Sequence, residues 1–392
     1  MEEYFLNFDR CAVYIHVPFC MSKCIYCDYN SITKHEFIDQ YFKFLEKEIE
    51  MYIPEIGEKV ISTIYFGGGT PSLVHPRYIE KIYKKITSVF NNDLKEITIE
   101  VNPETVTTDL MESYKNIGIN RISVGIQSAD NDVLKICGRL YNEKKLFEST
   151  EIIRNFFDNI NFDFINGLPL ENENTYIKNH EFIKYFKPEH VSYYNLDISY
   201  ETKLKKMLRK KEIKLPDPYF VDLMLDKSNL FLKEIGYKHY EISSYAILDK
   251  ESTHNLFYWQ NFEYFGFGVS AGGYYNRSRY LNMKNISEYI KYVEKGKFPY
   301  DFKVKNLLFE DFKETLFMGL RLIKGLSIKD LKEKYGEKNI EKALFALEKD
   351  IGDLLKINEN IFISEQGLNF SRKVFEYIAC MEDFFYGDER KS

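Results

Sequence analysis

The chain has 392 residues, of which 44% are hydrophobic and 29% charged, and its net charge is −6. This length accommodates one large catalytic domain and a smaller one, and the negative charge argues against nucleic acid as a partner. The opening residues, MEEYFLNFDR, lack the basic and apolar regions of a signal peptide, and no apolar run approaches the ~20 residues that cross a bilayer. We expect a cytoplasmic protein without a transmembrane segment.

Short apolar segments alternate with amphipathic segments over the first half of the chain. The spacing between them is that of a strand–helix unit, and each apolar segment is rich in β-branched or aromatic residues. The pattern predicts an α/β fold with a partial (β/α)6 TIM-like barrel. The predicted strands are Ala12–Val17, Ile61–Phe66, Ile97–Val101, Arg121–Ile126, Ile160–Ile165 and Val191–Leu196, and the predicted helices are 37–51, 77–90, 107–116, 143–157 and 175–185.

Three of the six cysteines, Cys20, Cys24 and Cys27, lie within eight residues directly after the first predicted strand. Disulfides are disfavoured in a reducing compartment, and an odd number of clustered thiols suits metal ligation better. The alternatives are a buried apolar stripe on a helix and a zinc site, although no second CxxC or HxxxH pair exists to complete the latter. Iron–sulfur clusters normally take four thiolates, so three would leave one iron open to another ligand.

A glycine run, Gly67-Gly68-Gly69-Thr70-Pro71, follows the second predicted strand. Glycines permit unusual backbone angles and close backbone approach, and free N–H groups at such a turn suit a carboxylate or a polar nucleoside. A simple tight turn between strand and helix is the alternative.

Polar side chains recur where later strands end. Glu100 ends the third strand, Gln127 follows the fourth, and Asp163 lies in the fifth; Arg139 stands between these two strands. Ligand contacts collect at the carboxyl ends of barrel strands. Any one of these residues could be in an ordinary surface ion pair, but their recurrence predicts a binding site.

The segment Thr202–Lys214 reads as a charged helix containing Lys203, Lys205, Lys206, Arg209, Lys210 and Lys211. Such a helix is usually a solvated face, and contact with an anionic partner is the alternative.

Beyond a boundary near Gly296–Lys303 the chain reads as three helices and then a two-stranded segment around Leu355–Ile363. This order resembles a winged-helix module, but that fold alone does not establish DNA binding. We therefore divide the chain into a core barrel (1–200), an extension of it (201–295) and a smaller, mostly helical, winged-helix-like domain (296–392).

The CxxxCxxC spacing resembles the radical S-adenosylmethionine (SAM) superfamily. YIHVPFCMSKCIYCDYN, YFGGGTPS, IEVNPE, RISVGIQS, INGLP, YEISSYA and HNLFYW, in this order over residues 14–259, are similar to the oxygen-independent coproporphyrinogen III oxidase family. The resemblance implies a [4Fe–4S] cluster on the three cysteines, whose open iron binds SAM before a 5′-deoxyadenosyl radical forms. The residues that it implies in SAM binding are Tyr14, Gly68, Gly69, Thr70, Glu100, Gln127, Arg139 and Asp163.

Two branches of that family differ near the cluster. The dehydrogenase branch carries a fourth cysteine two places after the third, where this chain has Tyr29, and a long extension before a cluster that here follows only 19 residues. In both features the chain resembles the other branch, the HemW-like heme chaperones. Where family members commonly have a histidine two residues after the arginine of a Gly-Arg pair, this chain has Tyr141, which puts in doubt any chemistry attributed to that histidine.

The same branch carries an HNxxYW signature, found here at residues 254–259. Imidazole is a natural axial ligand of heme iron, and aromatic rings pack on porphyrin faces. The resemblance thus implies heme contacts at His254, Tyr258 and Trp259. The alternative is a histidine satisfied within an aromatic core.

The resemblance implies a heme chaperone that binds heme and SAM and passes heme to acceptor proteins, with an electron donor such as flavodoxin or ferredoxin. Peripheral membrane association is compatible with it. One alternative is an anaerobic coproporphyrinogen III dehydrogenase that converts two propionates to vinyls. Another is a non-catalytic iron–sulfur protein. Whether the protein is an enzyme is left open, and no catalytic residue is assigned.

Overall fold

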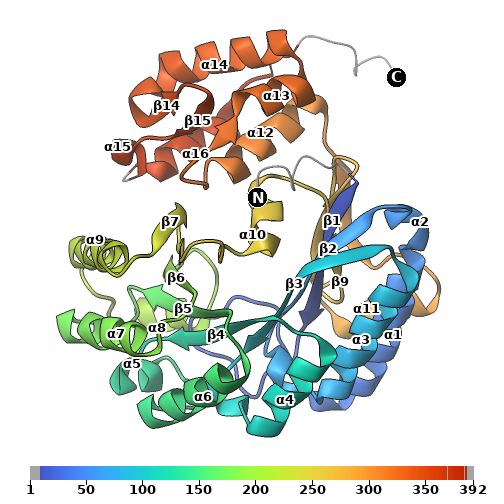
Figure 1. Ribbon diagram of the computed structural model, residues 1–392, viewed down its shortest axis with the longest axis vertical. Helices are drawn as coiled ribbons and strands as arrows, with labels where there is room; N and C mark the ends of the chain where they lie inside the picture. The colour runs from blue at the N-terminus through green and yellow to red at the C-terminus, as the bar shows by residue number, and fades with distance from the viewer. Residues whose placement is uncertain (1–8, 369, 384, 386–392) are drawn as a thin grey trace.

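The computed structural model describes residues 9–368, 370–383 and 385. Figure 1 shows a large curved sheet with helices along its outer side and a smaller helical module above it. The sheet has twelve strands in the order β12-β11-β10-β9-β1-β2-β3-β4-β5-β6-β8-β7. Because β12 forms one edge and β7 the other among the described strands, the barrel is open.

The six predicted strands form the parallel centre of this sheet, in chain order. They are β1 (Arg10–Val17), β2 (Val60–Gly68), β3 (Asn92–Val101), β4 (Arg121–Gln127), β5 (Ile160–Asn166) and β6 (His190–Asn195). The predicted helices are confirmed as α1 (Ile38–Met51), α3 (Pro76–Val89), α4 (Thr108–Ile117), α6 (Glu143–Phe156) and α7 (Glu173–Phe186), with the short α2 (Ile53–Ile56) and α5 (Asn131–Ile136) beside them. The prediction of a partial barrel is therefore confirmed.

Alternation along the strands explains which face meets the helices. On β4, Ile122, Val124 and Ile126 are fully buried in the main hydrophobic core. Burial of each such side chain contributes about 1.5–3 kcal/mol. The intervening Ser123 turns toward the lumen, where its hydroxyl donates to Asp163. The strand thus fixes the core on one side and presents polar groups on the other.

The segment after α8 (Lys203–Arg209) and α9 (Pro218–Glu234) extends the sheet at both edges. β7 (Lys238–Glu241) and β8 (Ser244–Ala246) add to β6, whereas β9 (Tyr264–Phe267), β10 (Gly272–Tyr275), β11 (Ser278–Asn282) and β12 (Tyr300–Lys305) add beyond β1. β9 pairs with β1 in parallel. Gly266 is required there, because a Cβ would lie 1.9 Å from the carbonyl oxygen of Gly272. Helices α10 (Thr253–Trp259) and α11 (Ile286–Glu294) lie within this segment.

The charged helix predicted over Thr202–Lys214 is shorter than expected. α8 ends at Arg209, and Lys211 adopts a left-handed conformation with φ of 59°. A residue in that conformation cannot continue a right-handed helix. Lysine and arginine favour helices, so the local residue types do not indicate this end.

The C-terminal module has its own hydrophobic core, which runs from Phe309 to Met381. Its elements are α12 (Leu308–Gly319), β13 (Leu326–Ser327), α13 (Ile328–Tyr335), α14 (Glu337–Ile351), β14 (Leu355–Ile357), β15 (Asn360–Ile363), α15 (Glu365–Leu368) and α16 (Ser371–Cys380). The two-stranded segment is confirmed, and β13 adds an unpredicted third strand to it. The predicted start of this domain at residue 296 precedes β12, which belongs to the large sheet; the division into domains stays a prediction.

Helices that could cross a membrane are absent from the described part of the chain, where none is both long and apolar enough.

Candidate functional site

The three clustered cysteines lie in a loop between β1 and α1, not on a helix. The loop is closed on itself, because Cys20 N donates to Ile32 O (3.0 Å) and Ile32 N to Pro18 O (2.7 Å). It is also tied to its surroundings, since Ile25 N donates to Cys137 O at 3.2 Å. The alternative of a buried helical stripe is therefore wrong.

Hydrogen-bond donors point at two of the three thiols. Thr70 Oγ1 lies 3.6 Å from Cys20 Sγ, and Arg139 Nη1 lies 3.3 Å from Cys24 Sγ. Donors of this kind stabilise a thiolate that binds a metal. Burial raises the pKa of Cys27 to about 11, so this thiol stays neutral until a metal displaces its proton.

Within residues 9–368, 370–383 and 385, no three His, Cys, Asp or Glu side chains stand close enough to hold one metal ion. The ligands of an iron–sulfur cluster bind different irons, so they stand farther apart than the ligands of one zinc. Three thiols in one loop, two of them facing hydrogen-bond donors, are a donor set that fits an iron–sulfur cluster.

The glycine turn at the end of β2 packs directly on the cysteine loop. A Cβ on Gly69 would lie 2.9 Å from the carbonyl oxygen of Phe19 and 3.0 Å from Cys20 Sγ. Thr70 N donates to Phe19 O at 2.8 Å, and Gly68 has φ of 118°. Glycine is thus needed here for a close approach and for a left-handed backbone.

Glu100 connects this turn to the lumen. Its carboxylate accepts from Gly68 N and from the Tyr65 hydroxyl, both at 3.0 Å. Burial, followed by the nearby charge of Asp163, raises the pKa of Glu100 to about 7. Burial likewise raises the pKa of Asp163, although Ser123 (2.7 Å) and Asn161 (2.8 Å) donate to it. The lumen therefore holds two carboxyl groups that can accept from a polar ligand.

Tyr14 lies on the same side as Glu100. Its ring stacks on Tyr65 with centroids 6.1 Å apart, and its hydroxyl lies 3.0 Å from His16 Nδ1. A Cβ on Gly67 would meet Tyr14, Tyr65 and Glu100 within 3.0 Å. The predicted Tyr14 and Glu100 are thus brought together across the glycine turn.

Arg139 lies between the cysteine loop and the strand ends. Besides Cys24, its guanidinium reaches Asn102 Oδ1 (2.8 Å) and Gly125 O (3.3 Å), while Nε donates to the Tyr141 hydroxyl at 3.2 Å. Tyr141 in turn donates to Gly125 O at 2.7 Å. Tyr141 therefore positions Arg139.

Asn102 is a site residue that sequence reasoning missed. Its Nδ2 donates to Thr70 Oγ1 at 3.0 Å, so it connects the glycine turn to Arg139. Its place in IEVNPE, two residues after Glu100, was the available signal. Gln127, with φ of 64°, folds back so that a Cβ on Gly125 would lie 2.8 Å from its amide nitrogen. Positive φ at a non-glycine residue is common at functional sites.

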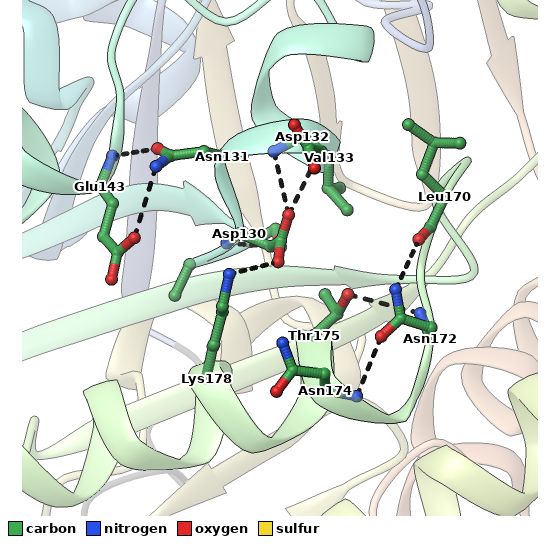
Figure 2. A network of polar contacts seen from close by, with 12 residues as sticks. Asp130, Asn131, Asp132, Val133, Glu143, Leu170, Asn172, Asn174, Thr175 and Lys178 are labelled. Atoms are coloured by element: carbon green, nitrogen blue, oxygen red, sulfur yellow. Dashed lines mark hydrogen bonds and ion pairs between the residues drawn. The ribbon is translucent and has the colours of Figure 1, made fainter.

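The segment that leads to Arg139 is fixed by a polar network shown in Figure 2. Asp130 accepts from Asp132 N (2.9 Å) and Val133 N (3.4 Å) at the start of α5, and Lys178 of α7 donates to its other oxygen at 2.7 Å. This ion pair joins α5 to α7 near the site. It restricts the position of the chain that continues to Arg139.

His254 lies at the first turn of α10, about 1% exposed. Its Nδ1 lies 2.7 Å from Thr63 Oγ1 and its Nε2 2.7 Å from the Tyr258 hydroxyl. Burial, and next the charge of Arg121, lowers its pKa to about 3. The imidazole is therefore neutral, and both of its nitrogens are engaged in hydrogen bonds.

Trp259 faces a different neighbourhood at the end of α10. It packs on a small apolar cluster that includes Leu322, with the Arg321 guanidinium 4.5 Å from the ring centroid. Its indole N–H is buried and finds no hydrogen-bond partner among the residues that the structure describes. The structure thus brings His254 and Tyr258 together and turns Trp259 toward the C-terminal module.

Glu96 was not predicted, yet it fixes the start of α10. Its carboxylate accepts from Thr253 N (2.8 Å), His254 N (3.2 Å) and Ser252 Oγ (3.2 Å). A carboxylate at this position satisfies the free N–H groups of a first helical turn. Nothing in the sequence around Glu96 indicated this partner, which lies more than 150 residues away.

An open parallel barrel with this cysteine loop and glycine turn defines a protein of the radical SAM class, and the family model "Radical SAM superfamily" matches residues 14–183. Curated relatives narrow the class. Heme chaperone HemW of Bacillus subtilis (strain 168) is 31% identical over 375 residues, 93% of this chain and 98% of that protein. Heme chaperone HemW of Buchnera aphidicola subsp. Schizaphis graminum is 34% identical, over 88% of this chain and 94% of its own. This chain belongs to the HemW family of radical SAM proteins.

The fold has a solved counterpart. Coproporphyrinogen III oxidase (HemN) from Escherichia coli superposes with a TM-score of 0.82 over 97% of this chain and 92% of its own, at 22% identity. At that identity the likeness shows the fold alone. The eight residues expected to contact SAM lie around the cysteine loop and the lumen, and their contact with SAM stays a prediction.

Proposed function

We propose that this protein is a cytoplasmic heme chaperone that binds heme and SAM beside a [4Fe–4S] cluster and delivers heme to acceptor proteins. The observation that carries the proposal is similarity to heme chaperones along nearly the whole chain, 93% of it in the Bacillus subtilis relative. Tyr29, at the place of the dehydrogenase branch's fourth cysteine, supports it.

Cys20, Cys24 and Cys27 would hold the cluster. When bound, the cluster supplies an iron with an open position and an electron for SAM cleavage. The residues of the chain bind and orient the cofactor. Arg139 holds its donor toward Cys24, and Glu100 and Asp163 offer buried acceptors to amino or hydroxyl groups. The glycine turn packs against the loop beside Cys20.

Heme would contact His254, Tyr258 and Trp259. For His254 to reach iron, Nε2 must leave the Tyr258 hydroxyl, a competing hydrogen bond worth about 1 kcal/mol. Tyr258→Phe keeps the ring but removes this competitor, so we expect heme to bind several-fold more tightly, by about a factor of five. His254→Ala should abolish the Soret shift of the heme-bound protein.

Heme titration of the reconstituted protein, followed at the Soret band, measures both variants. His75→Ala is the matched control, because His75 is exposed at the start of α3. If the His254→Ala protein bound heme like its parent in this titration, the assignment of His254 as the heme-iron ligand would be wrong.

Coproporphyrinogen III dehydrogenation is the second candidate, favoured by the fold shared with the Escherichia coli oxidase. Anaerobic incubation with reductant, SAM and coproporphyrinogen III separates the two. We expect no vinyl product. Conversion of propionates to vinyls would instead show that the protein is a dehydrogenase and would overturn the proposed chaperone function. Absence of a SAM-dependent change in the cluster's spectrum would instead indicate a non-catalytic iron–sulfur protein.

A further inference from the structure

Helix α8 is attached to the cysteine loop. Leu204 N donates to Ile25 O at 2.7 Å, and Ile25 lies between Cys24 and Cys27 in the chain. Leu204 is fully buried and Ile25 is 5% exposed. One face of α8 thus packs by the cysteine loop, whereas Lys203, Lys206 and Lys210 of the same helix segment are exposed.

The exposed face of α8 is basic, although the net charge of the whole chain is negative. Residues 202–214 contain seven lysines and arginines and one acidic residue, whereas the chain carries −6. Lys203, Lys206 and Lys210 are exposed, and their spacing of three and four residues places them on one side of the helix. We call these three residues the α8 basic patch.

Acidic neighbours leave this patch largely uncompensated. Glu201 pairs with Lys205 (3.4 Å) and Arg209 (2.7 Å) instead. Lys210 reaches Glu212 only at 3.8 Å between exposed groups, a pair worth little. In the ranges that the structure describes, Lys203 and Lys206 form no ion pair.

Apolar side chains are exposed directly before the helix. Ile198 is 44% exposed and Tyr200 is 54% exposed. An apolar centre beside charged side chains is the composition of small, transient protein interfaces, among which electron-transfer complexes are typical. Complementary charge raises the rate at which such partners meet.

We propose that the α8 basic patch docks a small acidic protein that donates the electron to the cluster bound by Cys20, Cys24 and Cys27. This inference rests on the proposed function, because it requires that cluster. One electron passes from the reduced donor to the cluster; no bond forms or breaks, and no proton moves. The contact between Leu204 and Ile25 favours this partner over a membrane or a nucleic acid, since docking here brings a donor beside the cysteine loop.

The test compares Lys203→Glu/Lys206→Glu/Lys210→Glu with the parent, both reconstituted anaerobically, using a reduced bacterial flavodoxin as the probe. We expect at least about tenfold weaker flavodoxin binding, and a loss of the steep salt dependence that the parent shows. The rate of cluster reduction by flavodoxin should fall by a similar factor. Reduction by dithionite, a small reductant that needs no docking surface, should be unchanged.

The control is Lys338→Glu/Lys349→Glu/Lys356→Glu, the same charge change on exposed lysines of the C-terminal module. If the control weakened flavodoxin binding equally, the effect would come from net charge alone, and the proposal would be overturned. So would unchanged flavodoxin binding by the α8 variant, or an effect confined to heme titration or to anionic vesicles. Heme binding is measured on the same samples, so failure of the chaperone function is visible separately.

Discussion

Single residues set how the cysteine loop and the glycine turn meet. A Cβ on Gly69 would lie 2.9 Å from the carbonyl oxygen of Phe19 and 3.0 Å from the sulfur of Cys20, so no side chain fits at this position. The backbone of the loop is hydrogen-bonded on both sides of this contact. The close approach therefore couples the position of Cys20 to the conformation of the turn that follows β2.

Gly69→Ala tests this coupling. The added Cβ would lie 2.9 Å from backbone atoms of Pro18 and Phe19, which cannot move as a flexible side chain can. We expect at least about half of the iron and sulfide to be lost after anaerobic reconstitution, with a cost of about 1–3 kcal/mol from overpacking. Iron and sulfide analysis measures the effect.

Gly352→Ala is the matched control for this experiment, because its Cβ would meet only Glu348 Cγ at 3.6 Å, an ordinary contact. Full cluster loading in the Gly69→Ala protein would contradict the coupling.

At the scale of single residues, the polar side chains at strand ends could be predicted from the sequence. The distant residues that they contact could not. Glu100, Gln127 and Asp163 stand out because a polar side chain at the end of an apolar strand is locally visible. Asn102 and Glu96 take their importance from Arg139 and α10, which lie far away in the sequence. Contacts of that kind depend on the fold, so one sequence without its structure does not reveal them.

At the scale of elements, α10 depends on a carboxylate supplied by β3. Glu96→Gln replaces one acceptor oxygen by a donor that faces the N–H groups of Thr253 and His254. Loss of a capping acceptor costs about 0.5–2 kcal/mol. We expect faster hydrogen exchange across residues 253–259 and a weaker hold on His254.

Hydrogen exchange followed by mass spectrometry measures this, with Glu112→Gln on an exposed position of α4 as the control. Equal protection of 253–259 in the parent and the Glu96→Gln protein would show that α10 is held by packing alone.

Element types were easier to predict than element ends. Strands β1–β6 are short segments rich in β-branched or aromatic residues, so their existence follows from the sequence. The end of α8 does not, because every residue from Lys205 to Lys211 favours a helix while Lys211 turns left-handed. β13 has two residues, too few for any periodic pattern.

At the scale of the whole molecule, a buried carboxyl group joins helix α1, near the start of the chain, to residues 268–289, which lie more than two hundred residues later. Glu48 of α1, fully buried, accepts from Gly268 N (2.7 Å), Asn282 Nδ2 (2.6 Å) and the Tyr289 hydroxyl (2.6 Å). Burial raises its pKa to about 7, although these donors oppose the shift. Tyr41 is a further phenol close to it.

A raised pKa in the folded state makes stability fall as pH rises. Below the unfolded pKa of about 4.5 the group is neutral in both states, and its contribution is lost as pH passes through about 7. The loss is about 3 kcal/mol by the free energy of one pKa unit. Glu48→Gln stays neutral, so its urea-unfolding free energy should decline less than that of the parent between pH 5 and 8.

Fluorescence of Trp259, the single tryptophan, reports the unfolding. The comparison uses the slope with pH, not the absolute stability, because glutamine also changes the hydrogen bond to Asn282. Parallel profiles for the two proteins would assign the pH dependence to other groups.

The parallel pairing of β1 with β9 has a consequence for biosynthesis. Residues 12–15 acquire their neighbours at 264–267, and Asn30 beside the cysteines donates to Lys284 O. During translation the cysteines therefore emerge more than two hundred residues before the segments that contact β1 and the cysteine loop, at residues 264–267 and Lys284. The cysteine loop therefore reaches its final surroundings only after most of the polypeptide has left the ribosome.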